Sequence, residues 1–156
     1  MVAQVGDVLL LLWRKVADAA IAYAVQRFVM RRKYFNEQTK DQLWEKKETK
    51  ESPFPVGTIV TDHFEVVDHT PESITVRCGD SPSKKGVRES DGLFQINAKV
   101  DEERQELVLS LKSVFYQGLG KSEGPPMPRW MQYLHLGYAL ALLENGSREL
   151  TTSKLF

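Results

Sequence analysis

The sequence LFQINAKVDEERQELVLSLKSVFY, residues 93–116, has the pattern of two β-strands joined by a tight turn. In its first half, Phe94, Ile96 and Ala98 alternate with Gln95 and Asn97. In its second half, Leu107, Leu109 and Leu111 fall on one side of a strand, and Val108, Ser110 and Lys112 fall on the other. The polar residues 101–104 between the two halves have the length of a hairpin turn. Strict alternation is typical of antiparallel strands with one buried face.

Further elements are predicted on both sides of this hairpin. Residues 58–67 and 73–78 are rich in β-branched and aromatic side chains, which favours two more strands. Residues 7–33 contain no glycine or proline and many leucines and alanines, which predicts a long helix. Residues 37–50 are charged, and we expect a surface helix or a solvated linker. The polar segment 79–92 is predicted to be a long loop, functional or mobile.

A last helix is predicted over about residues 128–145. Pro128 stands at its start and Gly146 just past its end, which fits the preferences of helix termini. Its residues are apolar on nearly every side, so we expect it to be buried or to cover a cavity. The fold class is therefore α+β: an antiparallel sheet gripping a long C-terminal helix, with an added long N-terminal helix.

Composition sets the size and setting of the protein. The chain has 156 residues, 42% of them hydrophobic and 27% charged, as in one globular domain. We predict a single domain over 1–156, with a helical region at 1–50 and the sheet and closing helix at 55–148. The counts of basic and acidic residues are both 21, so net charge does not favour nucleic acid as a partner. The single cysteine favours a cytoplasmic protein, and so do the charged residues that follow the apolar run at 8–13 and end it before it could span a membrane.

This element order resembles the helix-grip domains of the START and polyketide-cyclase superfamily. The opening G-T-x-V at 57–60 and the aromatic-rich closing helix carry the resemblance. The strings GDSPSKKGVRESDGLF (79–94), KSVFYQGLGK (112–121), PMPRW and LHLGYA are similar to those of small fungal proteins. The resemblance implies a cavity between the sheet and the long helix that holds a hydrophobic small molecule. In that superfamily such a cavity serves lipid transport, ligand binding or the cyclisation and dehydration of polyketides.

Polar groups on the closing helix and its neighbours are the candidate site residues for such a cavity. His135 is the candidate general acid or base, because histidine titrates near neutral pH, and Tyr138 or Tyr116 would orient a carbonyl. Trp130, which lies close to His135 along the helix, is a candidate ligand contact, as is Phe94 on the apolar side of its strand. The alternative is that these side chains belong to an ordinary core.

Charged side chains give a second set of candidate ligand contacts. Arg77 and Lys112 would recognise an anionic group if their strand faces lined the cavity, and they are an ordinary wet exterior if they do not. In the long loop, pairing of Arg88 with Asp91 or Asp80 would shape the mouth of a pocket. A solvated charge cluster is the alternative.

Metals and cofactors are not expected. Asp62 and His63 point to opposite faces of a strand, so too few ligands share one side. The sequence has no nucleotide-binding loop and no nucleophile motif. Cys78 lies on the apolar alternation, where a buried, inert thiol is expected.

Two hypotheses for the function follow, and the sequence leaves open whether the protein is an enzyme or a carrier. The first is binding of a hydrophobic small molecule, with cofactor-free cyclase, isomerase or dehydratase chemistry as its catalytic form. The alternative is a peripheral membrane or lipid-binding protein, anchored by the N-terminal helix, with residues 9–13 among acyl chains and Arg31, Arg32 and Lys33 on anionic headgroups. A homodimer through the first helix is a further hypothesis.

Overall fold

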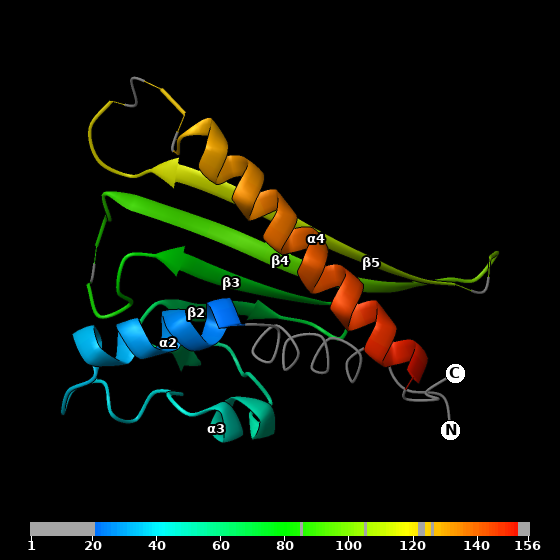
Figure 1. The fold of residues 1–156 in the computed structure, drawn as a ribbon, viewed down its shortest axis with the longest axis horizontal. Helices are drawn as coiled ribbons and strands as arrows, with labels where there is room; N and C mark the ends of the chain where they lie inside the picture. Colours follow the sequence, from blue (N-terminus) through cyan, green and yellow to red (C-terminus); the bar gives the residue numbers. More distant parts are fainter. Residues whose placement is uncertain (1–20, 85, 105, 122–123, 126, 153–156) are drawn as a thin grey trace.

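A mixed α+β fold is present in the computed structural model, which describes residues 21–84, 86–104, 106–121, 124–125 and 127–152. The five strands form one antiparallel sheet, and α4 lies diagonally across one face of it (Figure 1). The predicted fold class is confirmed to that extent. The elements in chain order are α2 (Ile21–Tyr34), α3 (Lys46–Glu51), β1 (Ile59–Val60), β2 (Phe64–His69), β3 (Ser73–Gly79), β4 (Ser90–Asp101), β5 (Glu106–Gln117) and α4 (Arg129–Thr152).

The strands follow one another in the sheet in the same order as in the chain, β1-β2-β3-β4-β5. The predicted hairpin is its longest unit, because β4 and β5 pair continuously from Ser90 with Gln117 to Asp101 with Glu106. β2 pairs with β3 through a register shift between Val66 and Asp68. β1 and β5 are therefore the two edges of the described sheet.

Strand alternation divides the sheet into two chemically different faces, since directly paired residues of neighbouring strands point to the same side. The apolar face carries Ile74, Val76 and Cys78 from β3, Phe94, Ile96 and Ala98 from β4, and Leu107, Leu109 and Leu111 from β5. The polar face carries Arg77, Asp91, Gln95, Lys112 and Tyr116.

The core lies on the apolar face. Phe54, from the segment after α3, is fully buried there with Val60 and Val66, and Ile96 and Ala98 of β4 are buried in the same cluster. Leucines of β5 pack against this cluster while remaining half-buried. Burial is thus densest over β2, β3 and the second half of β4.

The segment between α2 and β1 differs from the prediction of a solvated helix or linker over 37–50. Residues 37–41 form turns, α3 is only six residues long, and Trp44 is buried. The Trp44 indole N–H donates to the Thr39 carbonyl at 2.6 Å, and its ring meets the Phe35 ring edge-on at 5.4 Å. Packing of this one aromatic side chain against local partners fixes a segment whose other residues are mostly exposed.

The predicted strand over 58–67 is divided in two. Thr61 and Asp62 have φ of 53° and 50°, a left-handed conformation that ends β1 and begins the turn into β2. Asp62 is held there because Gln42 donates to its carboxylate and accepts from its backbone N–H. The contact joins residues twenty positions apart, which no local pattern could reveal.

The two helices predicted near the ends of the sequence correspond to α2 and α4. Residues 21–34 of the N-terminal helix form α2, while residues 7–20 lie outside the described residues. The expectation that the last helix is buried is wrong, because α4 packs on the sheet with one side among the described residues. Large apolar side chains on its other sides are exposed to solvent: Trp130, Met131, Tyr133, Leu134, Leu136 and Leu140. The alternative, that the helix covers a cavity, stays a prediction. Among the described residues, no helix is both long enough and apolar enough to span a bilayer.

Candidate functional site

Alternation along the strands separates the predicted site residues into two groups. Phe94 lies on the apolar face, where α4 brings His135 beside β5. Arg77, Asp91, Lys112 and Tyr116 lie on the polar face. Tyr116 therefore cannot assist His135 at one site, since the sheet stands between them.

His135 lies at the contact between α4 and β5. Its Nε2 is 3.3 Å from the Ser113 hydroxyl, and its ring meets the Phe115 ring edge-on with centroids 4.8 Å apart. Within the described residues, Nδ1 of His135 has no hydrogen-bond partner. The imidazole is half-buried, so one ring nitrogen remains available to a bound molecule.

A glycine makes room for the Phe115 ring. Gly92 is paired with Phe115 across the β4–β5 ladder, and a Cβ at Gly92 would lie 2.9 Å from Phe115 Cδ1 and 3.2 Å from Cys78 Sγ. A real Cβ essentially never lies as close as 2.9 Å to such an atom, and 3.2 Å is tight, so a side chain here would require the Phe115 ring to shift. Because Gly92 has no side chain, the Phe115 ring can lie close to the sheet where it meets His135.

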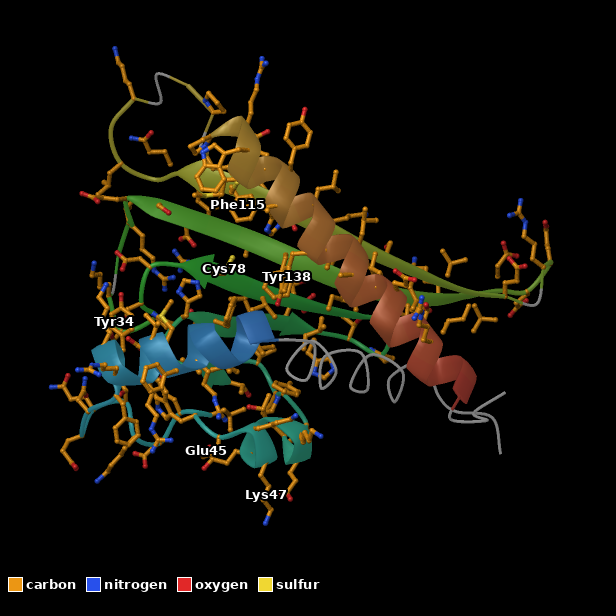
Figure 2. The ribbon with its side chains drawn as sticks, in the orientation of Figure 1. Tyr34, Glu45, Lys47, Cys78, Phe115 and Tyr138 are labelled. Atoms are coloured by element: carbon orange, nitrogen blue, oxygen red, sulfur yellow. The ribbon has the colours of Figure 1, made fainter. Side chains whose placement is uncertain are left out.

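Four half-buried rings on this part of the apolar face form two edge-on pairs, which we call together the ring cluster. Phe115 meets His135 in one pair, and Phe64 meets Phe94 at 6.1 Å in the other. Tyr138 extends from α4 over the middle of the sheet, on the side where Cys78 lies (Figure 2). Sequence reasoning missed Phe115 and Ser113, although they continue the leucine alternation of β5 by two steps.

Cys78 is poorly suited to act as a nucleophile. Burial raises the pKa of its thiol to about 11, with the charge of Asp91 acting in the same direction. The thiol is therefore protonated near neutral pH, and it behaves as a small apolar side chain. The predicted burial of Cys78 is confirmed.

Three of the charged candidates, Arg77, Arg88 and Asp91, lie together where β3 ends and β4 begins, whereas Lys112 lies further along the sheet, opposite Gln95. Arg77 Nε donates to Asp91 Oδ2 at 2.8 Å, and its Nη2 donates to the same oxygen. Arg88 comes from the loop, with side-chain exposure of 3%, and lies 3.6 Å from Glu65 and 3.9 Å from Asp91. Its Nη1 also donates to the Asp80 carbonyl at 3.2 Å. The predicted pairing of Arg88 with Asp91 thus exists, as part of a four-residue ion network.

Asp91 is the centre of this network. Burial by itself would raise the pKa of Asp91, but hydrogen bonds from Arg77 and the Gly92 N–H, together with the charges of Arg77 and Arg88, lower it overall. The carboxylate is therefore firmly ionised near neutral pH. One donor is left over, because Arg88 Nε is buried without a partner among the described residues.

The loop after β3 is fastened at a second point. The Ser81 hydroxyl donates to Asp62 Oδ2 at 2.7 Å, and the other oxygen of Asp62 accepts from Gln42 at 3.0 Å. Lys84 pairs with Asp80 at 2.6 Å, which lowers the pKa of Asp80 and raises that of Lys84. These contacts hold the loop in place and give the polar network a structural role.

Metal-binding chemistry finds no support in the described part of the chain, where no three His, Cys, Asp or Glu side chains come together as ligands. Burial lowers the pKa of His63, although the charges of Asp62 and Asp80 oppose that shift. Its ring packs edge-on against Phe64 at 4.7 Å. His63 is thus a mainly neutral side chain at the border of the ring cluster.

Comparison of the chain with family models, with curated proteins and with solved structures finds no match. The resemblance to helix-grip domains therefore stays a prediction. The two faces of its own sheet are therefore the basis for proposing a function for this chain.

Replacing Asp91 by asparagine tests whether the polar network stabilises the fold. Asp91→Asn keeps the shape of the side chain and removes the charge that pairs with both arginines. We expect the free energy of unfolding near neutral pH to fall by about 2 kcal/mol, which is less than for a fully buried pair because Arg77 is partly in water. Urea unfolding of both proteins over a series of pH values measures the difference.

The pH dependence follows from the lowered pKa of Asp91. Its charge stabilises the folded state above the ordinary aspartate pKa of about 3.9, and this contribution is lost as the pH falls through the lowered folded value. The stability difference between wild type and variant should therefore shrink in acid. Glu89→Gln, at an exposed neighbouring position, should change stability by less than about 0.5 kcal/mol. An Asp91→Asn effect that is constant with pH would contradict this account.

Proposed function

We propose that the chain binds a hydrophobic small molecule between α4 and the apolar face of the sheet. The observation that carries this proposal is the ring cluster, which is apolar, half-buried and adjacent to one unpaired imidazole nitrogen. Binding sites for small molecules combine apolar walls with a few polar groups that fix orientation. His135 is such a group.

The way α4 is attached supports the same proposal. α4 makes most of its contacts with β5, and its contacts with the remaining elements are sparser. Phe94 on β4 is consequently only half-buried, while Ile96 and Ala98 further along the same strand are fully buried. A ligand seated against Phe94 and Phe115 would bury apolar surface, at about 25 cal/mol for each Å² removed from water.

The resemblance to polyketide cyclases adds a reaction class to the proposal. An imidazole nitrogen held against apolar rings can take a proton from a bound carbonyl compound and return it elsewhere, which is what cyclisation, isomerisation and dehydration require. Tyr138, three residues further along α4, is the residue that would orient the carbonyl. Tyr116 has no part in this proposal because it lies on the polar face.

Native mass spectrometry of the gently purified protein tests the binding proposal. We expect a stoichiometric apolar adduct that is released on denaturation. His135→Phe keeps an aromatic ring but removes the nitrogen atoms, so we expect affinity for the re-added adduct to fall about tenfold, as for the loss of one hydrogen bond.

The matched control is Tyr133→Phe, an aromatic change on the outer side of the same helix, where the tyrosine is 73% exposed. Its affinity for the adduct should equal that of the wild type. A protein that carries no adduct and takes up no apolar compound would contradict the proposal. Equal losses in both variants would contradict the role of His135.

A second candidate function, contact with an anionic lipid surface, is favoured by the end of α2. Phe28 and Val29 are 66% and 50% exposed, and basic side chains follow at Arg31, Arg32 and Lys33. Exposed apolar side chains beside a cluster of positive charge are typical of helices that lie at a membrane interface. The charge of Arg31 is partly neutralised, because Arg31 pairs with Glu45.

Co-sedimentation with anionic vesicles tests this second function. We expect pelleting at low salt that weakens at high salt, because each basic residue contributes about 1 kcal/mol at an anionic surface. Arg32→Glu with Lys33→Glu should abolish pelleting, whereas Lys46→Glu with Lys47→Glu on exposed α3 makes the same change in net charge and should leave it intact. No pelleting of the wild type at low salt would contradict lipid contact.

A further inference from the structure

The free edge of β5 is the feature from which the further inference starts. The two edges of the described sheet differ greatly: β1 has two residues and its Val60 bridges Leu43, whereas β5 has twelve residues in continuous register with β4. Edge strands in soluble proteins are usually protected by shortness, proline, bulges or several charges. β5 lacks proline and bulge, and Glu106 and Lys112 are its only charged residues.

Hydrogen bonds beside β5 show which backbone groups point outward. Gly118 donates its N–H to the Glu89 carbonyl at 3.1 Å, which continues the β4–β5 ladder by one residue pair. Hydrogen-bonded and non-hydrogen-bonded pairs alternate along an antiparallel ladder. The even-numbered residues of β5 therefore direct their N–H and C=O groups toward β4. Ala98 of β4 is opposite Leu109, an odd-numbered residue of β5, and it donates its N–H away from β5, to the Glu72 carbonyl. This is the direction expected if only even-numbered residues of β5 bond to β4.

The odd-numbered residues of β5 therefore direct N–H and C=O away from the sheet. They are Leu107, Leu109, Leu111, Ser113 and Phe115. Within the described residues, no backbone hydrogen bond between loops or elements reaches these outward groups. Only another strand can pair such a row of alternating donors and acceptors along its whole length.

Exposed apolar side chains occur beside the same edge. Val108 and Val114 of β5 are 50% and 58% exposed on the polar face. On the other face, α4 begins beside the free edge of β5 (Figure 1), and Trp130 and Leu134 in its first turns are 61% and 64% exposed. A strand added to β5 would thus meet apolar side chains on both of its faces.

We propose that β5 pairs with β5 of a second copy of this chain, in antiparallel orientation about a two-fold axis at Leu111, to form a continuous sheet across a homodimer. This axis allows pairing of the whole strand from Glu106 to Tyr116. It also sets Val108 opposite the partner's Val114, and Lys112 opposite the partner's Ser110. Shifting the axis to Lys112 would place two lysines face to face, which opposes pairing.

The apolar face and the net charge fit the same dimer. With the axis at Leu111, Leu107 is opposite the partner's Phe115, and Leu109 is opposite the partner's Ser113. The first turns of α4 would then cover the start of the partner strand with Trp130 and Leu134. The formal net charge of the chain is zero, so no long-range repulsion opposes self-association.

Sedimentation velocity of the full chain over a range of concentrations tests the dimer. We expect a reversible dimer whose dissociation constant rises at least about tenfold in Val108→Lys with Val114→Lys, because this variant loses two valine pairs and faces lysine with lysine. The control is Val56→Lys with Val87→Lys, which adds the same charge at positions 61% and 67% exposed in loops, and it should dimerise as the wild type does.

Hydrogen exchange separates this interface from any other. The Leu109, Leu111 and Ser113 amides should be protected in the dimer and exchange at least about tenfold faster in the Val108→Lys with Val114→Lys variant. Circular dichroism serves to check that the variant remains folded. A wild type that is monomeric at every concentration would overturn the proposal. A dimer insensitive to the two lysines, or protection of these amides that persists in a monomer, would overturn it as well.

Discussion

The division of one antiparallel sheet into an apolar and a polar face is the constraint on which the other features of this protein depend. Residues one apart on a strand cannot share a face, so Phe115 reaches α4 while its neighbour Tyr116 cannot. The same rule places Arg77 and Asp91 in an ion network on the side away from His135. Each predicted role is thereby limited to one side of the sheet.

Helix α4 is the basis of both proposals, because it has more apolar surface than one face of the sheet buries. One side of α4 meets β5 through His135, and the half-buried rings beside that contact are suited to an apolar ligand. The other sides of α4 expose residues such as Trp130 and Leu134, which favours burial against a second molecule. The proposed ligand binding and the proposed self-association therefore use different sides of one helix.

Local patterns were sufficient to predict β3, β4, β5 and the presence of the last helix, since alternation and helix periodicity are properties of neighbouring residues. The predicted end of that helix is wrong, because α4 continues past Gly146 to Thr152. Local patterns failed where a distant contact decides the local conformation. Hydrogen bonds from Gln42 and Ser81 hold Asp62 in a left-handed conformation, which divides a predicted strand. Trp44 is buried within a segment that is otherwise charged. The pairing of Arg88 with Asp91 was predictable from their spacing in the loop, whereas the contact of His135 with Phe115 required the diagonal course of α4 (Figure 1).

Chemical-shift mapping by NMR tests the central claim, that the apolar face under α4 is where small molecules bind. Isotope-labelled protein would be titrated with the apolar dye anilinonaphthalene sulfonate, and ring signals of both faces would be followed. The account predicts saturable shifts of Phe94, Phe115 and His135, with Tyr116 unchanged. Shifts confined to Tyr116 and its neighbours on the polar face, or no saturable shift of any ring, would contradict it.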